Sequence, residues 1–527
     1  MASTNHPKKQ YLPPPWARRG KLRLALVPGG PSETARMILA GEWDGRPASL
    51  LSAARYGPEL VEELAAQGIN AVALTWSPGL SHESDQAQCE ILQRLLPLLM
   101  KKRIRAIARI AVDVAAPELA AHMPEAKLPL TPPSPARGEG ERGEYGAAAW
   151  PDQKSRCCRM DIGNPRWREY VAQKVHKASA AGFDGLLFEG AANLHEAAQF
   201  LRELRAEAQG CCAPQAPGLL FCAPGWCAPD LDEVCNLKLI VVSGDRQPIS
   251  KQPETFSCVS PRFSTSVPLL KLAFEQGGRD KPFAAQVAAG ALTDKQRRLA
   301  VAEIMAAGGT CAALDLPGHY GAFLQDCPGL FGASDPVGTI GVIVSDAVVS
   351  GFVGHLPFLD ALVRANVQFD ILPLSRFEQF DFRKYKLLIA AGLSVPAPAP
   401  LEKALDLFVN EHGGTTYLTP SPAREEFEAS VIPGIRASAT QQPVEVAAPE
   451  GLIALLWGKG TRRWVHLLNY REEPCDATIT LPGCGGRKVN AYSPDEAPLT
   501  LQILEAGPAC VSFLLSGVQT YAVAEVV

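Results

Sequence analysis

The stretch AAGFDGLLFEG, residues 180–190, holds a short apolar run between two acids, Asp184 and Glu189. Glycines flank this run on both sides, as they do where a chain leaves or enters a turn. Strands of a parallel sheet that is covered on both faces are continuously apolar in the same way. The stretch therefore predicts a buried parallel strand at 184–188 that ends on a carboxylate, with Asp184 ordering the turn before the strand.

Similar apolar runs recur along much of the chain and alternate with helical patterns. Strands are predicted at 22–27, 70–76, 105–112, 184–188, 218–222, 237–243, 282–287 and 310–315. Helices are predicted at 58–68, 86–103, 165–182 and 294–309, the last with Thr293 as its N-cap. Eight strands with intervening helices predict an α/β fold, a (β/α)8 TIM barrel at 21–335 after an N-terminal extension at 1–20. A doubly wound sheet is the alternative.

One segment, 127–146, interrupts this alternation. It is rich in Pro, Gly and charged residues and has almost no large apolar side chain after Leu130. Such a segment cannot bury enough apolar surface to offset its ordering entropy, so we predict a mobile insertion within the barrel. A lid over the barrel mouth is a second interpretation of the same segment.

Two smaller domains are predicted after the barrel. Strands at 338–345, 368–374, 385–392 and 415–419 with helices at 355–367 and 400–414 indicate a small open α/β domain at 338–437. This domain resembles a glutamine amidotransferase, but its strand 385–392 leads to no Cys, so a thiol nucleophile is absent. Short strands separated by turn residues fill 440–527 and predict an antiparallel β sandwich.

Composition and charge exclude several classes of function. The 527-residue chain is 47% apolar and 20% charged with a net charge of −4, so no nucleic-acid partner is expected. We expect no membrane partner, because no apolar run approaches the ~18 residues of a membrane span. The basic start of the chain is followed by no apolar signal region, and the 14 cysteines include no Cys-x-x-Cys pair. A cytoplasmic protein with reduced cysteines is therefore predicted.

No cofactor is expected, because the glycine-rich patterns that bind nucleotides are missing from the sequence. Cys222, Cys227 and Cys235 lie close together in sequence, and a zinc site is the alternative interpretation of these residues. Structural zinc sites usually show closely paired ligands, which these spacings do not provide. We therefore predict buried free thiols and no metal.

Polar residues at the carboxyl ends of the predicted strands are the candidates for chemistry, since barrel sites form there. Glu189 and Asp245 are the predicted catalytic pair, because two carboxyl groups can serve as nucleophile or base and as general acid on a glycosidic bond. Aromatic faces stack on sugar rings, and polar side chains bond sugar hydroxyls. The residues predicted to bind the substrate are Trp76, Arg109, Trp226, Asp315 and His319.

These residues also have purely structural interpretations. Glu189 could cap the following turn or pair with an arginine. Arg109 lies inside a predicted strand and could point inward to pair with an acid at a strand end. Trp76 and Trp226 could pack in the core, and Asp245 could belong to an ordinary turn.

A family resemblance supports the sugar interpretation. MDIGNPRWREYVAQKVHKASAAGFDGLLFEG at 160–190 resembles the fourth-strand region of glycoside hydrolase barrels, where a helix opening N-P-x-x-R precedes a strand that ends on an acid. LTDKQRRLAVAEIMAAGGTCAALD at 292–315 resembles their seventh helix and eighth strand. The domain order resembles that of family 42 β-galactosidases. This resemblance implies a middle domain that makes oligomer contacts, so a homo-oligomer through 338–437 is possible.

The match at individual positions is partial. Glu189 falls where many such barrels have a catalytic carboxylate, often Asp, and family 42 enzymes have Asn before this Glu, where this chain has Phe. At the end of the sixth strand Gly244 replaces a common acid and Asp245 follows it, and the seventh strand offers only Gln286.

Two hypotheses therefore remain open. In the first, the protein hydrolyses a glycosidic bond in an oligosaccharide or glycoside, with Glu189 as nucleophile or base and Asp245 as general acid. In the second, it is a catalytically inactive carbohydrate-binding or scaffold protein built on a degenerate glycosidase barrel.

Overall fold

The structure, a computed structural model, describes residues 12–27, 56–77, 79, 82–128, 158–189, 194–211, 220–224, 235–242, 265–277, 281–287, 292–313, 316–331, 334–345, 355–391, 399–412, 415–419, 432–438 and 442–527. The chain forms two compact units. The first comprises Met1–Val241, Asp280–Gln286 and Cys311–Asp315, and the second comprises the remaining segments. Glu189 belongs to the first unit.

An eight-stranded sheet organises the first unit. Its strands are β1 (Leu24–Leu26), β2 (Ala71–Ser77), β3 (Arg105–Ala111), β6 (Gly185–Glu189), β7 (Leu220–Pro224), β8 (Leu237–Val242), β9 (Phe283–Val287) and β10 (Thr310–Cys311). They are ordered in space as in the sequence, and the pairs from β1 to β8 are parallel. Each overlaps a predicted strand, so the predicted parallel sheet is confirmed.

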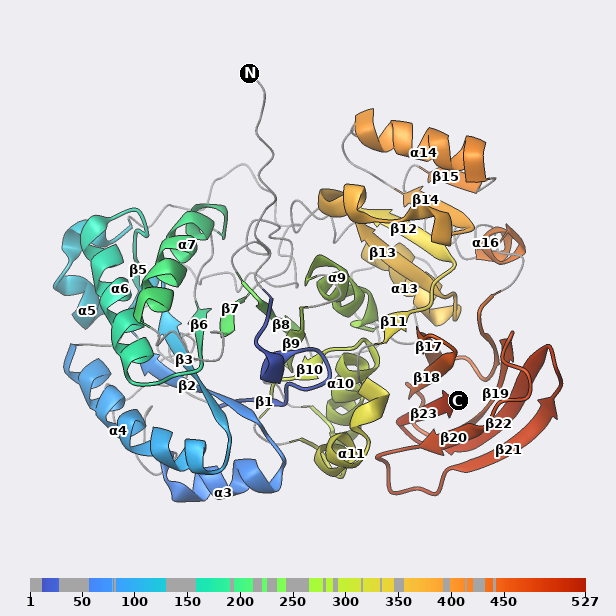
Figure 1. The fold of residues 1–527 in the computed structure, drawn as a ribbon, viewed down its shortest axis with the longest axis horizontal. Coiled ribbons are helices and arrows are strands. Elements are labelled where there is room, and N and C mark those ends of the chain that lie inside the picture. Colours follow the sequence, from blue (N-terminus) through green and yellow to red (C-terminus); the bar gives the residue numbers. More distant parts are fainter. Residues whose placement is uncertain are drawn as a thin grey trace, which may run out of the picture. The chain divides into compact units, whose positions relative to one another are not determined.

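Helices cover one face of this sheet, as Figure 1 shows for β2, β3 and β6. They are α3 (Pro58–Ala66), α4 (His82–Lys101), α6 (Pro165–Ala180) and α7 (Leu194–Cys211). The α4 helix begins four residues before its predicted start and continues through Pro97 as a single helix. Asn164 caps α6 by accepting hydrogen bonds from the backbone N–H groups of Arg166 and Trp167. In the described part of the chain, no helix has both the length and the apolar composition needed to cross a bilayer.

The two faces of the sheet carry different cores, because side chains alternate along a strand. Leu74, Ile110 and Phe188 belong to the core that also contains residues of α3, α4, α6 and α7. Ala73 and Leu187, one residue before two of these, belong to a second apolar cluster. That second cluster lies on the face of the sheet turned away from these helices.

A short addition between β3 and β6 was not expected from the sequence. It consists of the two-residue strands β4 (Val114–Ala115) and β5 (Cys158–Arg159), paired antiparallel, and the helix α5 (Pro117–Ala121). Two-residue strands carry too little periodicity to be recognised in a sequence. Of the predicted insertion 127–146, only Lys127 and Leu128 lie within the described residues, and Lys127 bridges to Met160.

The second unit contains a four-stranded parallel sheet in the order β13-β12-β14-β15. Its strands are β12 (Ile340–Val344), β13 (Phe369–Pro373), β14 (Leu387–Ala391) and β15 (Thr415–Thr419). The accompanying helices are α13 (Leu356–Arg364), α14 (Ala399–His412) and α16 (Ile432–Ser438). The crossover from β13 to β14 passes the central strand β12, as in open α/β sheets. The strands and the first two helices agree with the predicted positions.

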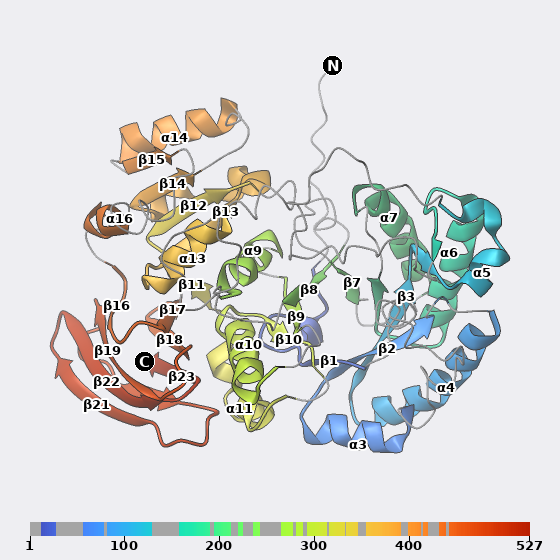
Figure 2. The ribbon, with the colours of Figure 1, turned by 180° about the vertical axis from the view of Figure 1, so that it is seen from behind.

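Two antiparallel sheets follow and share one apolar core. The first contains β11 (Asp335–Pro336), β17 (Leu452–Lys459), β18 (Arg462–Asn469), β23 (Tyr521–Val526) and β20 (Val489–Tyr492). The second contains β16 (Glu445–Ala447), β19 (Cys475–Pro482), β22 (Cys510–Val518) and β21 (Thr500–Ala506). Figure 2 shows β19, β22 and β21 as three neighbouring ribbons. The predicted antiparallel C-terminal region is therefore present.

Two helices that follow strands of the first unit are grouped with the second unit. They are α9 (Val267–Gly277), which the sequence patterns did not delimit, and α10 (Asp294–Ala306), whose predicted cap Thr293 is confirmed as part of a capping box. Trp457 donates a hydrogen bond from Nε1 to the backbone carbonyl of Ala306 at 2.7 Å. The buried Glu303 accepts hydrogen bonds from Tyr470 and Thr265. The predicted boundary at 335 remains a prediction.

A buried histidine in β18 makes the second unit sensitive to pH. His466 is 2% exposed, and its Nδ1 lies 2.6 Å from the hydroxyl of the buried Tyr521. Burial lowers the pKa of His466 from 6.5 to about 3. Between pH 6.5 and about pH 3, the side chain of His466 is protonated in the unfolded chain but not in the folded chain. The contribution of neutral His466 to the free energy of unfolding is therefore complete above pH 6.5. It is lost as the pH falls from 6.5 toward about 3.

We predict that the free energy of unfolding, measured in urea, falls between pH 6 and pH 4 more steeply in the wild type than in His466→Phe. The difference in slope should reach about 1.4 kcal/mol per pH unit, the value for one proton. His319→Phe, which replaces an exposed histidine of the same unit, should keep the wild-type slope. Equal slopes for wild type and His466→Phe contradict the assignment.

Candidate active site

A buried ion pair between β3 and β6 is the most prominent charged feature of the first unit. The Nε and Nη2 groups of Arg109 both lie 2.6 Å from Oε1 of Glu189. Arg109 is 5% exposed and Glu189 is 4% exposed. The interpretation of Arg109 as the partner of a strand-end acid is therefore confirmed.

A third contact of Arg109 reaches a strand that is not its neighbour. Its Nη1 donates a hydrogen bond of 2.6 Å to the backbone carbonyl of Val27, the residue after β1. Because β2 lies between β1 and β3, the side chain spans two strand spacings, about 10 Å, across the sheet. Arg109 thus connects the ends of β1, β3 and β6.

Strand register explains why the two side chains meet. Arg109 lies opposite Leu187, and Glu189 lies opposite Ala111 at the last position of β6. Ile107 and Leu187 belong to the apolar cluster on the face turned away from α3, α4, α6 and α7, so alternation places Arg109 and Glu189 on that same face. The ion pair therefore stands at the carboxyl end of an otherwise apolar layer.

That layer draws side chains from all eight strand regions. Its members include Leu24 and Leu26 of β1, Ala71 and Ala73 of β2, Ile107 of β3, Leu187 of β6, Leu220 of β7, Leu237 and Leu239 of β8, Ala284 of β9 and Ala312 just after β10. The layer combines small residues of β2 and β9 with larger ones of β1, β6 and β8. A side-chain layer of this kind fills the interior of barrels whose strands contribute in turn.

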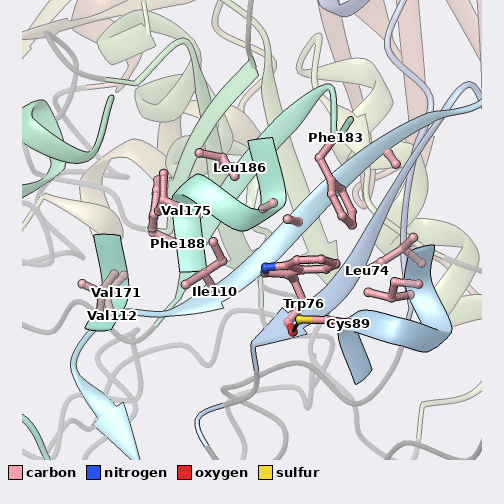
Figure 3. Close-up of a cluster of buried hydrophobic side chains, with 14 of the residues drawn as sticks. Leu74, Trp76, Cys89, Ile110, Val112, Val171, Val175, Phe183, Leu186 and Phe188 are labelled. Atoms are coloured by element: carbon pink, nitrogen blue, oxygen red, sulfur yellow. Dashed lines mark hydrogen bonds between the residues drawn. The ribbon is translucent and has the colours of Figure 1, made fainter. Parts of the chain in front are cut away.

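Trp76 lies on the opposite face of β2, among the helices. It is 0% exposed, its Nε1 donates to the backbone carbonyl of Lys174 at 3.1 Å, and its ring meets Phe183 edge-on at 5.1 Å. Figure 3 shows the indole among Leu74, Phe183 and Cys89. A sugar-stacking role needs an exposed ring face, and Trp76 has none. We therefore leave Trp76 out of the proposed site.

The remaining predicted site residues fall either in the second unit or outside the described residues. His319 lies before α11 (Tyr320–Asp326) in the second unit, where its exposed ring is 3.6 Å from Glu496. Asp245, Trp226 and Asp315 lie outside the described residues. Arg109 and Glu189 are thus the two predicted residues whose contact the structure shows.

A buried polar network that sequence reasoning missed ties β2 to its covering helices. Asp85 is 0% exposed, and its Oδ2 accepts hydrogen bonds from Ser77 at 2.5 Å and Tyr170 at 2.7 Å. Lys174, one turn after Tyr170 on α6, lies 3.4 Å from the same oxygen. The four-residue spacing of Tyr170 and Lys174 indicates that they share one face of a helix. Their partner Asp85 lies on a different helix, α4, so the sequence does not reveal the contact.

The residues that the structure describes form neither a metal site nor a reactive thiol site. No group of three or more His, Cys, Asp or Glu residues there is arranged to hold a metal ion. Eight cysteines whose side chains the structure describes are free thiols, six of them buried. Burial raises the pKa of the Cys89 thiol to about 11, so this thiol stays protonated and unreactive at neutral pH.

The sequence matches no family model and no curated protein. Solved structures do match the fold. Alpha-L-fucosidase isoenzyme 2 from Paenibacillus thiaminolyticus is 11% identical with a TM-score of 0.63, covering 89% of this chain and 96% of that one. The β-galactosidase from Rahnella sp. R3 is 10% identical with a TM-score of 0.60, covering 98% and 100%. A GH42 β-galactosidase from G. stearothermophilus is 9% identical with a TM-score of 0.57, covering 92% and 97%.

The chain has a glycosidase-like fold. The likeness extends over nearly the whole of both chains, so it includes the C-terminal regions as well as the eight-stranded sheet. This confirms the resemblance to glycoside hydrolase barrels inferred from 160–190 and 292–315. At such low identity the likeness concerns the fold, and the chemistry of the site has to be argued from its own residues.

We predict that Glu189→Leu lowers the free energy of unfolding by about 3–5 kcal/mol, because it leaves the guanidinium of Arg109 buried without its carboxylate. The double variant Glu189→Leu with Arg109→Met should recover most of this loss, since it removes both charges and keeps the volume. Chemical denaturation of the wild type, the single variants Glu189→Leu and Arg109→Met, and the double variant measures the coupling.

The matched control is the second Arg–acid pair between the same strands. Arg105 Nη1 lies 2.8 Å from Oδ1 of Asp184, and the Arg105 side chain is 42% exposed. Arg105→Met should therefore cost less than about 1 kcal/mol. A loss for Glu189→Leu no greater than that of Arg105→Met contradicts the buried pair.

Proposed function

We propose that the protein is a glycoside hydrolase-like enzyme in which Glu189 is the catalytic nucleophile or base. The observation that carries this proposal is the carboxylate of Glu189, paired with Arg109, at the carboxyl end of β6 in an eight-stranded sheet whose strands from β1 to β8 are parallel, in a chain with a glycosidase-like fold. Active sites of (β/α)8 enzymes form at that end. We further propose that the sheet closes into a barrel, supported by the shared apolar layer of all eight strands.

The proposed chemistry uses two carboxyl groups. A nucleophile or base carries negative charge, and an arginine is the usual ion-pair partner of a carboxylate. Glu189 suits that role better than the role of proton donor. Asp245 is the proposed general acid, with Asp315, Trp226 and His319 as proposed substrate contacts. A separation of ~5–5.5 Å between the two carboxyl groups would imply retention, and ~6.5–9.5 Å would imply inversion.

The proposed substrate is a carbohydrate. The solved structures of similar fold carry names of fucosidases and galactosidases, which supports this class without selecting a sugar. A homo-oligomer through 338–437 is part of the same proposal. It is supported by the parallel sheet found in that region and by the family resemblance.

A second candidate function is a catalytically inactive carbohydrate-binding or scaffold protein. The observation that favours it is the burial of Glu189, which is 4% exposed and held by two N–H groups of Arg109. A carboxylate in that state can serve to neutralise Arg109 and to hold β3 and β6 together. The two candidates differ in turnover, and sugar binding is expected of the enzyme and of a carbohydrate-binding protein, but not of a scaffold.

We predict that the wild type hydrolyses at least one member of a panel of aryl α- and β-glycosides that includes α-L-fucosides and β-D-galactosides. Glu189→Gln should lower kcat on that substrate by at least about 100-fold, because it removes the charge and keeps the shape and the hydrogen bond to Arg109. Release of the aryl group, followed by absorbance, measures both proteins.

The control variant is Asp184→Asn, the same chemical change at the amino end of the same strand, where the acid pairs with Arg105. It should keep kcat within about threefold of the wild type. Turnover that survives in Glu189→Gln removes Glu189 from the mechanism. A wild type that binds sugars in calorimetry but hydrolyses none supports the inactive candidate.

A further inference from the structure

We propose that Lys271 is a reaction site at which a small aldehyde or ketone binds covalently as an imine. Lys271 belongs to the second unit, whereas Glu189 belongs to the first. The inference therefore goes beyond the proposed function and does not depend on it. Its basis is a pocket that Lys271 lines together with apolar residues of α9, β13 and β17.

The size of this pocket limits its ligand to a few non-hydrogen atoms. Three polar residues line it, Lys271, Glu275 and Asp370, and the rest of the wall is apolar and includes Phe274 and Trp457. The rings of Phe274 and Trp457 meet edge-on with their centroids 5.2 Å apart. The centre of a water-sized molecule can occupy about 20 Å³ of the pocket. Because one water needs about 10–15 Å³ on this measure, the space suits a two- or three-carbon compound.

The charges around the pocket favour a neutral ligand. Lys271 and Glu275 line it with opposite charges. The carboxylate of Asp370 is already paired with Lys384, whose Nζ lies 2.5 Å from Oδ2, and Tyr385 donates a hydrogen bond of 3.0 Å to the same oxygen. An ionic ligand would add a charge without a partner beside a mostly apolar wall, which is costly.

The backbone and ring of Phe369 hold the Lys271 ammonium, and they could hold an imine cation in the same way. Nζ of Lys271 donates a hydrogen bond to the Phe369 carbonyl and lies 4.5 Å from the centroid of the Phe369 ring. The hydrogen bond uses one of the three N–H donors of the ammonium. A protonated imine keeps one N–H and one positive charge, so it can retain both contacts.

Burial also makes Lys271 easier to deprotonate. It lowers the pKa of the ammonium from 10.5, and the charge of Lys384 lowers it too, while Asp370 and Glu275 act in the opposite direction. Lysines that are desolvated in an apolar pocket or lie near a second cation are activated nucleophiles, because the neutral amine is the form that attacks. A neutral carbonyl compound is the electrophile that such lysines bind as a Schiff base.

The proposed reaction balances without an oxidant or a reductant. The ammonium of Lys271 first loses a proton, and the neutral Nζ attacks the carbonyl carbon to give a carbinolamine. The hydroxyl of this intermediate then takes up a proton and leaves as water while the nitrogen lone pair forms the C=N bond. One water is released, and the protonated imine carries the same single positive charge as the original ammonium. The charge balance of the pocket is therefore preserved.

The test treats the folded full-length protein with limiting glycolaldehyde at neutral pH and with cyanoborohydride, which reduces an imine to a stable secondary amine. Peptide mapping by mass spectrometry then measures the label on each lysine. The label on Lys271 should exceed that on Lys384 about tenfold or more, because one pKa unit changes the neutral fraction of an amine tenfold. The comparison is strict, since the Lys384 side chain is 32% exposed.

Three variants provide the controls. Ala307 lines the pocket and is 1% exposed, so Ala307→Leu should fill the space and remove most of the label from an unchanged Lys271. Ala322→Leu, the same change at an exposed position of α11, should keep the wild-type label. Glu189→Gln should keep it as well, whatever its effect on glycoside hydrolysis, so the two proposals are tested separately. If Ala307→Leu does not fold, Ala307→Val takes its place.

A last measurement repeats the labelling of the wild type in urea. The preference for Lys271 should disappear there, because the pocket exists in the folded chain alone. Label that is spread over exposed lysines without preference for Lys271 overturns the proposal. So does a preference that persists in urea or in a folded protein whose pocket is filled at Ala307, since the reaction would then owe nothing to the pocket.

Discussion

The charge of Glu189 has to be balanced inside the protein, and Arg109 provides the balance. A carboxylate that is almost fully buried would be too costly without a partner, and the cost of burying two charges is offset only by short, well-directed hydrogen bonds. Arg109 supplies two of these to Glu189 at 2.6 Å and a third to the carbonyl of Val27. The candidate site depends on this arrangement, because it keeps an ionised group at the end of an apolar layer.

The architecture of the sheet determines where that pair can form. Parallel strands in sequence order bring their carboxyl ends to one edge, and the alternation of side chains sends Arg109 and Glu189 to the face opposite the covering helices. On the helix side, Asp85 holds Ser77, Tyr170 and Lys174 together, so β2, α4 and α6 are connected by their own polar network. In the part of the sheet that the structure describes, each face thus carries a buried charged cluster. One joins strand ends, and the other joins strand to helix.

Much of the fold could be predicted from the sequence, because its signals are local. Continuous apolar runs located the strands, and Thr293 marks a helix start that the structure confirms by a side-chain hydrogen bond. The pairing of Arg109 with a strand-end acid was also accessible, since an arginine inside an apolar strand needs a buried partner. What the sequence could not show was the face to which each residue turns. Trp76 lies in β2, whose seven residues are all buried, so period-two alternation shows no exposed side that would reveal the covered face. The bond to Val27 uses a backbone carbonyl and leaves no trace in residue identity.

The central claim is that Glu189 is a reactive carboxylate and more than a structural partner of Arg109. An epoxide-bearing sugar analogue tests it most directly, because attack by the active carboxylate opens the ring and leaves a stable ester. Peptide mapping by mass spectrometry then locates the added mass. The account predicts a single ester on Glu189, suppressed by competing sugar. An ester on a different carboxylate with Glu189 unmodified, or no ester in protein that binds the sugar, contradicts it.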